Sequence, residues 1–248
     1  MTLKMRLLLL FSLFALLLVG TWLYTTPAYT VRQVAITVSG GPEAIPEQAR
    51  QLLSTQVGTQ LLRLRTGEIA SQLKTLATIE DVQVGRRFPN TLTAHLDLVE
   101  SPVVIHASDE DVYYLIKEGK LVGLSKADAA LYTKSAVTVE IPASYAQMMV
   151  RWGVDRLFGQ VVELARDLDS ESSLITRVKY DNNSSKSFGK MVLELSSLNA
   201  QIWVREPVGA ARVEAAVALV QKDRADSLYF LDPETKRYDL YRQGLVRR

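Results

Sequence analysis

The sequence contains no cysteine among its 248 residues and only two histidines, His95 and His106. Without cysteine the chain has no disulfide framework, no thiolate nucleophile and no sulfur ligand for zinc. Two histidines by themselves supply too few ligands for a metal site. We therefore predict a protein that binds no metal and no cofactor.

The chain also lacks the motifs of phosphate-binding and hydrolytic sites. It has no glycine-rich phosphate loop, no Gly-x-Ser-x-Gly turn and no His-Glu-x-x-His helix. Neither histidine lies in the context of a serine nucleophile, and the acidic run 109–111 is typical of a solvated loop. We predict a protein that is not an enzyme and has no catalytic residue. A hydrolase that uses carboxylates alone stays open as an alternative.

An excess of charge of one sign is missing as well. The chain has 29 basic and 27 acidic residues; Lys4 and Arg6 precede the first apolar run, which leaves 27 of each sign in the remainder. A protein that binds nucleic acid through phosphate contacts needs a surplus of positive charge. We therefore expect no nucleic-acid partner.

What the sequence does have is an uncharged run of eighteen residues, Leu7–Tyr24. This length is at the lower end of what a helix needs to cross a bilayer. The two basic residues before it and the aromatic residues Trp22 and Tyr24 at its end predict an N-terminus inside and a C-terminus outside. We predict a cytoplasmic tail at 1–6, a transmembrane helix that contacts the lipid bilayer and a linker at 25–30. A cleaved secretory signal is the alternative.

Residues 31–103 have the pattern of a small α+β domain. Apolar side chains alternate along the first strand and again from Leu92 to Leu98, and two amphipathic helices are predicted between these strands. Phe88-Pro89-Asn90 predicts a turn between the last two strands. The order is strand, helix, helix, strand, strand, with both helices expected on one face of the sheet.

The run from Val82 to Leu92, VQVGRRFPNTL, followed by Val99-Glu100-Ser101-Pro102-Val103, resembles the sequence that closes a POTRA domain. In particular it is similar to the bacterial cell-division family called FtsQ or DivIB. That family reads apolar-x-apolar-x-Arg-x-x-Pro-x-x-Leu and ends a later strand in Glu-x-x-Pro. One membrane span followed directly by a single POTRA domain is also that family's layout.

Residues 104–241 predict a mixed β-rich domain with two helices, followed by a basic C-terminal tail at 242–248. A hairpin is expected at 112–122, a long helix at Ser144–Leu168, a meander of three strands and a second helix at Gly209–Asp223. Gly153 and Gly159 weaken the long helix, and a break near one of them is the alternative to a continuous helix. In the long helix, one broad apolar face is predicted, with its Met and Trp residues in the core; its members are Met148, Met149, Trp152, Leu157, Val161 and Leu164.

Two late strands, Leu228–Leu231 and Arg237–Tyr241, are predicted at the edge of the sheet. Edge strands leave backbone N–H and C=O groups unpaired, so they accept strands from other chains. Aromatic residues are favoured at such interfaces. The candidate partner-binding residues are Tyr229, Phe230, Leu231, Tyr238, Leu240 and Tyr241, together with Arg86 and Arg87.

The resemblance implies a single-pass type II protein of the bacterial inner membrane, with its bulk outside the cytoplasm at the division septum. It implies a scaffold that holds other division membrane proteins, especially small coiled-coil proteins, through the POTRA domain and the late edge strand. Two other functions stay open, namely a periplasmic POTRA-type chaperone for exported polypeptides and a cell-envelope hydrolase.

Overall fold

The computed structural model describes residues 3–100, 102–133, 137–169, 173–181, 190–205, 208–226 and 234–248. The chain divides into two compact units, Met1–Leu98 and Val99–Arg248. Each unit has its own hydrophobic core, one built on a three-stranded sheet and the other on a nine-stranded sheet within these described residues. Together they form a mixed α+β protein, as predicted.

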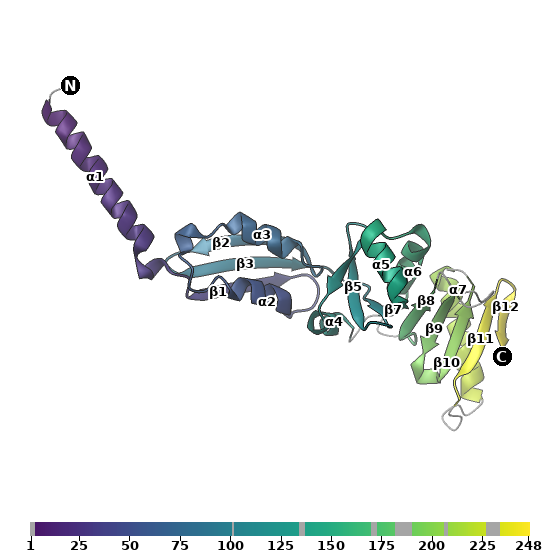
Figure 1. Ribbon diagram of the computed structural model, residues 1–248. Coiled ribbons are helices and arrows are strands. Elements are labelled where there is room, and N and C mark those ends of the chain that lie inside the picture. The colour runs from purple at the N-terminus through teal and green to yellow at the C-terminus, as the bar shows by residue number, and fades with distance from the viewer. Residues whose placement is uncertain are drawn as a thin grey trace. The chain divides into compact units, whose positions relative to one another are not determined.

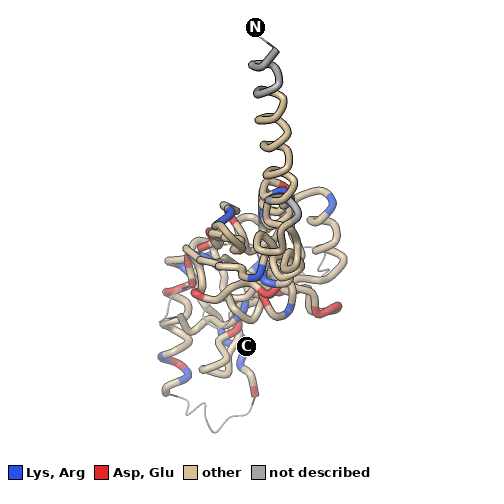
Figure 2. The backbone as a smooth tube through the Cα atoms, turned by 90° about the vertical axis from the view of Figure 1, so that its left-hand side faces the viewer, with Lys and Arg blue, Asp and Glu red and all other residues tan. Residues whose placement is uncertain are grey.

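The first unit begins with α1 (Leu3–Thr25), which contains the predicted span Leu7–Tyr24. Figure 2 shows the described turns of this helix without a charged residue. The side chains at 7–9 and 23–24 lie outside the described residues. Across the part of the chain that the structure describes, no helix combines the length and the apolar character needed to cross a membrane.

The rest of the first unit confirms the predicted order of strand, two helices and two strands (Figure 1). After the short helix η1 (Pro27–Tyr29), its elements are β1 (Gln33–Ser39), α2 (Glu47–Ser54), η2 (Leu61–Arg63), α3 (Thr66–Lys74), β2 (Ile79–Arg87) and β3 (Thr91–Leu98). The central strand β3 pairs in parallel with β1 and antiparallel with β2. This order brings the N-termini of β1 and β3 and the C-terminus of β2 to the same end of the sheet.

The alternation in β3 explains how the sheet meets its helices. Leu92, Ala94, Leu96 and Leu98 are at most 1% exposed and face Leu53 of α2 and Leu73 of α3 in one cluster. Successive side chains of a strand point to opposite faces, so the residues between them form the open face.

The second unit is a curved layer of strands with helices beside it (Figure 1). Its strands are β4 (Ile105–Ala107), β5 (Val112–Lys117), β6 (Lys120–Leu124), β7 (Thr138–Ile141), β8 (Arg177–Tyr180), β9 (Met191–Leu195), β10 (Ala200–Val204), β11 (Lys236–Tyr241) and β12 (Gly244–Arg247). Its helices are α4 (Lys126–Tyr132), α5 (Ala143–Trp152), α6 (Arg156–Asp167), η3 (Ser196–Leu198) and α7 (Ala210–Asp226). The order across the sheet is β12-β11-β10-β9-β8-β7-β4-β5-β6.

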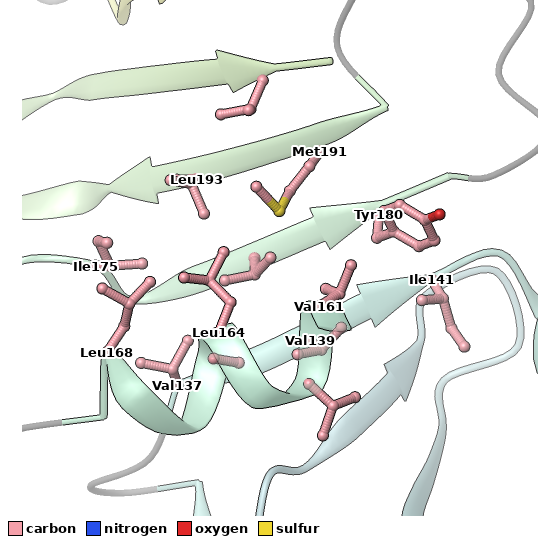
Figure 3. Close-up of a cluster of buried hydrophobic side chains, with 14 of the residues drawn as sticks. Val137, Val139, Ile141, Val161, Leu164, Leu168, Ile175, Tyr180, Met191 and Leu193 are labelled. Carbon is pink, nitrogen blue, oxygen red and sulfur yellow. The ribbon is translucent and has the colours of Figure 1, made fainter. Parts of the chain in front are cut away.

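The core of the second unit lies between this sheet and helices α5, α6 and α7. Figure 3 shows Val161 and Leu164 of α6, and Leu168, which directly follows this helix. Their side chains pack toward those of β7, β8 and β9. The predicted hairpin at 112–122 is confirmed as β5 and β6, with Glu118 and Gly119 in left-handed conformations at its turn.

Two predictions for this unit were wrong. The described residues of the unit form four α-helices rather than two, because α4 was missed and the predicted helix Ser144–Leu168 is two helices. Gly153 separates them with a φ of 94°, a conformation that a helix interior does not allow. Since the helix axis changes there, residues counted across the break do not share one face. Of the predicted apolar face, Met149, Val161 and Leu164 are buried, whereas Met148, Trp152 and Leu157 are 41%, 75% and 44% exposed.

Candidate partner-binding site

The last strand of the chain is one of the two edge strands of the nine-stranded sheet, and β6 is the other. β12 is outermost, and β11 lies between it and β10 (Figure 1). The prediction that Arg237–Tyr241 forms the edge was therefore wrong, and so was the prediction of a basic tail at 242–248. The chain turns at Arg242-Gln243 and returns antiparallel to β11 as a strand.

The register shows which backbone groups of β12 face outward. The backbone N–H of Arg248 donates to Arg237 O at 2.9 Å, so this pair carries a ladder bond. Ladder bonds alternate along an antiparallel pair. Asp239–Val246 and Tyr241–Gly244 therefore also bond to each other, whereas the N–H and C=O groups of Leu245 and Arg247 point away from β11. No other strand of the described residues pairs with this side of β12.

The predicted binding residues lie in different environments. Tyr238 and Leu240 are 2% and 8% exposed and belong to the hydrophobic core, whereas Tyr241 is 38% exposed. Tyr229, Phe230 and Leu231, with the predicted strand that contains them, lie outside the described residues. Near the edge strand the structure thus offers Tyr241 and Val246 (43% exposed) as accessible apolar groups.

Arg86 and Arg87 belong to the other unit, at the C-terminal end of β2. Both are exposed, and Nη2 of Arg86 donates to the backbone oxygen of Leu64. These two residues therefore belong to a different unit from the one that carries the β11–β12 edge.

A carboxylate on helix α7 fixes one side of the edge hairpin. Asp223 Oδ2 accepts the hydroxyl of Tyr238 at 2.6 Å and receives Nη1 of Arg247 at 3.2 Å. One side chain thus joins α7, β11 and β12. Burial raises the pKa of Tyr238 to about 12, and its hydrogen bond to the Asp223 carboxylate acts in the same direction.

A second carboxylate holds the hairpin from the open face of the sheet. The Asp239 side chain is only 3% exposed because two guanidinium groups cover it: Arg237 Nε lies 2.6 Å and Arg248 Nε 3.0 Å from its oxygens. Arg237 in turn lies 3.9 Å above the ring of Trp203, at cation–π distance. Hydrogen bonds to Tyr241 and then to Asp239 raise the pKa of Arg248. The edge strand is therefore fastened on both faces.

Sequence reasoning missed β12 and both carboxylates. The signal for β12 was present: Arg242-Gln243-Gly244 is a turn sequence, and Leu245-Val246 is apolar and has high strand propensity. Asp223 and Asp239 gave no signal of this kind, because Asp223 lies 24 positions from Arg247 and no local pattern links such residues.

The histidines and the acidic run form polar clusters elsewhere. On the open face of the first sheet, Nε2 of His95 contacts Ser39 Oγ at 3.2 Å and Asp97 Oδ1 at 3.4 Å. Nδ1 of the same ring contacts Thr37 Oγ1 at 2.9 Å, so a hydroxyl flanks each ring nitrogen of His95. In the second unit, Asp111 accepts from His106 at 3.1 Å, and hydrogen bonds from Lys126 and then His106 lower the pKa of the Asp111 carboxyl.

The neighbouring acidic residues have structural partners. Asp109 Oδ2 accepts the backbone N–H of Ala143 at 3.2 Å and so caps α5, and Glu110 accepts from Gln147 at 3.1 Å. Within the described residues, no group of three or more His, Cys, Asp or Glu side chains is placed to hold a metal ion.

Comparison with known proteins agrees with the fold of the first unit. Residues 31–97 match the family model described as "POTRA domain, FtsQ-type". Together with the order of strands and helices, this match defines a protein that carries a POTRA domain.

Two curated relatives, both named "Cell division protein FtsQ", extend this finding. The chain is 32% identical to the protein of Mycobacterium leprae over 88 residues, which is 35% of this chain and 24% of that protein. It is 28% identical to the protein of Streptomyces coelicolor over 202 residues, or 79% of this chain and 72% of that protein. The match thus spans about a quarter of the first relative and most of the second. These similarities support the assignment of the chain to the FtsQ/DivIB family.

Proposed function

We propose that this protein is a non-enzymatic scaffold of the septal cell-division complex and that it holds other division membrane proteins outside the cytoplasm. Similarity to two proteins that are named cell division proteins, together with the FtsQ-type POTRA match, supports a role in cell division. The scaffold mechanism is supported by the shape of the second unit, whose sheet ends in a fastened strand with unpaired backbone groups.

The single observation that carries the mechanism is the outer side of β12. Leu245 and Arg247 direct their backbone N–H and C=O groups away from the sheet, while Asp223 and Asp239 hold the strand against β11. A rigid edge loses little entropy when a partner strand adds to it, so main-chain hydrogen bonds can supply affinity. Val246 and Tyr241 beside the edge would contact side chains of the added strand.

The partners that best fit are small coiled-coil division proteins with a segment that can extend as a strand. This choice rests on the resemblance to the FtsQ/DivIB family. The POTRA domain, including Arg86 and Arg87, would contact other membrane proteins of the complex.

We further propose that Leu7–Tyr24 anchors the chain in the inner membrane. The support is the sequence: no charged residue interrupts this run, Lys4 and Arg6 precede it, and the whole run is helical within α1. The protein would then be a single-pass type II membrane protein with both units on the extracytoplasmic side, concentrated at the division septum.

The test compares Leu245→Pro with Leu245→Val in the full-length protein. Proline removes the outward N–H of residue 245, whereas valine keeps the N–H and an apolar side chain. We expect Leu245→Pro to lose co-purification of division membrane proteins from detergent-solubilised membranes, and Leu245→Val to retain it. Full capture by the proline variant would contradict strand addition at β12.

A photo-crosslinking measurement covers the case in which proline disturbs the hairpin. A benzophenone side chain at Val246 should crosslink to a small division protein in cells, and the same group at the exposed residue Lys222 on α7 should not. Crosslinking at Lys222 but not at Val246 would place the partner elsewhere on this unit.

A further inference from the structure

The POTRA domain separates its charges between its two ends. One end, here called the anchor end, contains the N-termini of β1 and β3, the C-terminus of β2 and the segment between α2 and α3. Within residues 31–98 it holds five arginines and one acid: Arg32, Arg63, Arg65, Arg86, Arg87 and Glu68. The opposite end holds five acids and two basic residues: Glu43, Glu47, Glu80, Asp81, Asp97, Arg50 and Lys74.

The chain joins α1 to the anchor end. α1 ends at Thr25, and the backbone oxygen of Thr26 accepts Nε2 of Gln60 at 3.3 Å. The ring of Tyr29 meets the ring of Phe88 edge-on, with centroids 6.1 Å apart. Since Tyr29 follows Thr25 by four residues, at most about 15 Å of chain separates the end of the helix from the residue that contacts Phe88.

The anchor end also exposes apolar side chains. Phe88 at the tip of the β2–β3 turn is 58% exposed, and Val57, in the segment after α2, is 50% exposed. The backbone N–H of the residue after Val57, Gly58, donates to Val31 O at 2.9 Å, which places this segment at the start of β1. Aromatic rings and arginine side chains together are typical of surfaces that lie at the headgroup level of a bilayer.

At least two of the arginines are available to bind a phosphate group. Arg32 and Arg87 are exposed, and their guanidinium groups form no hydrogen bond or ion pair with other described residues. The backbone N–H of Arg32 donates to Asn90 O at 2.9 Å, so the start of β1 lies directly beside the turn that carries Phe88. Guanidinium groups bind phosphate through paired hydrogen bonds.

We propose that the anchor end of the POTRA domain rests on the outer surface of the inner membrane, with Phe88 in the interfacial layer and Arg32 and Arg87 bound to phosphates of anionic phospholipids. This inference rests on the proposed membrane anchor. β2 separates Phe88 from Glu80 by eight residues, or about 26 Å. That distance exceeds the Debye length of about 8 Å, so the acids of the opposite end do not oppose the contact.

The absence of cysteine makes a direct test possible. Asn90→Cys places a single nitroxide label beside the turn, and Glu80→Cys places one at the other end of the same strand. The measurement is the collision rate of each label with a water-soluble nickel chelate and with oxygen, which is concentrated in the lipid. With the full-length protein in nanodiscs of phosphatidylglycerol and phosphatidylcholine, we expect the label at position 90 to collide less with the nickel chelate and more with oxygen than the label at position 80. The label at position 80 should remain water-exposed.

Two pairs of substitutions test the role of charge. The double variant Arg32→Gln/Arg87→Gln should abolish the shift toward oxygen collisions at position 90. The control double variant, Arg50→Gln/Lys74→Gln, also removes two positive charges, but from the opposite end, and should leave this shift unchanged. Nanodiscs of phosphatidylcholine alone should weaken the shift. Equal water exposure at positions 90 and 80, or equal loss of the shift with both pairs, would overturn the proposal. Failure of the anchor is distinguishable, because the chain would then leave the membranes on alkaline extraction.

Discussion

The two units of this protein use charged residues in opposite ways. In the POTRA domain the charges lie at the ends of the sheet, and the inward side chains of its central strand are entirely apolar. In the second unit charged side chains lie across the open face of the sheet. The Glu140 and Glu194 side chains are only 14% and 17% exposed there, with Arg177 2.9 Å from Glu140 and Lys179 2.9 Å from Glu194.

This difference shows how each sheet is held. Apolar packing fixes the POTRA sheet, and such packing neither titrates nor responds strongly to added salt. The β12 edge of the large sheet is positioned by Asp223 and Asp239, whose hydrogen bonds and ion pairs depend on charge and on geometry. We infer that a sheet edge held by polar contacts can be well ordered without a large apolar surface that would promote aggregation.

The largest expected effect comes from a change in the apolar POTRA core. Leu96→Ala removes a fully buried side chain in the middle of β3 and should lower the free energy of unfolding of this unit by about 2–5 kcal/mol. Urea titration followed by site-resolved hydrogen exchange on the full-length protein would measure it. Thr93→Ala, on the opposite face of the same strand, should change the unfolding free energy by less than about 0.5 kcal/mol. Equal losses in both variants would mean that the open face also holds this sheet.

The comparison also explains what could be predicted from the sequence. The POTRA elements were predicted because the alternation of Leu92, Ala94, Leu96 and Leu98 determines a face, and the face determines where the helices pack. A three-stranded sheet covered by two helices has few possible strand orders, so local sequence patterns nearly determine its topology.

The second unit was harder to predict because its arrangement depends on distant pairs. β11 pairs in parallel with β10, and α7 connects them, so the edge position depends on how the chain crosses over. The break at Gly153 was one of the two alternatives that the glycines of this helix offered, and the helical pattern of apolar residues did not decide between a break and a continuous helix. The roles of Asp223 and Asp239 follow only from contacts across strands, which no sequence window contains.

An intermediate effect is expected where charge fixes the edge. Asp239→Asn removes the charge between Arg237 and Arg248 and should destabilise the β11–β12 hairpin by about 1.5–3 kcal/mol, the usual value of a hydrogen bond to a charged group. Hydrogen exchange should show faster opening of 244–248 with unchanged protection in the POTRA domain. Glu234→Gln is the control, because Glu234 is the exposed partner of Lys236. Unchanged protection of β12 in Asp239→Asn would show that the strand is held without this carboxylate.

The smallest expected effect on stability comes from replacing either of two buried tyrosines, Tyr238 and Tyr132, whose pKa values are raised equally but whose hydroxyl groups have different surroundings. Burial raises the pKa of both Tyr238 and Tyr132 from 10 to about 12. Each phenol therefore stabilises the fold fully below pH 10 and loses that contribution between pH 10 and 12, because the unfolded chain ionises first. Phenylalanine at either position should reduce the alkaline loss of stability.

At neutral pH the two substitutions should differ. Tyr238→Phe loses the hydrogen bond to Asp223 and should cost about 1 kcal/mol. The buried hydroxyl of Tyr132 has no hydrogen-bond partner among the described residues, so Tyr132→Phe should leave stability unchanged or slightly increased. Urea midpoints at neutral pH and between pH 10 and 12 would separate the two contributions. If both variants lose the same stability at neutral pH, the Asp223 contact does not hold the edge, and packing alone positions β11 as it positions the POTRA strands.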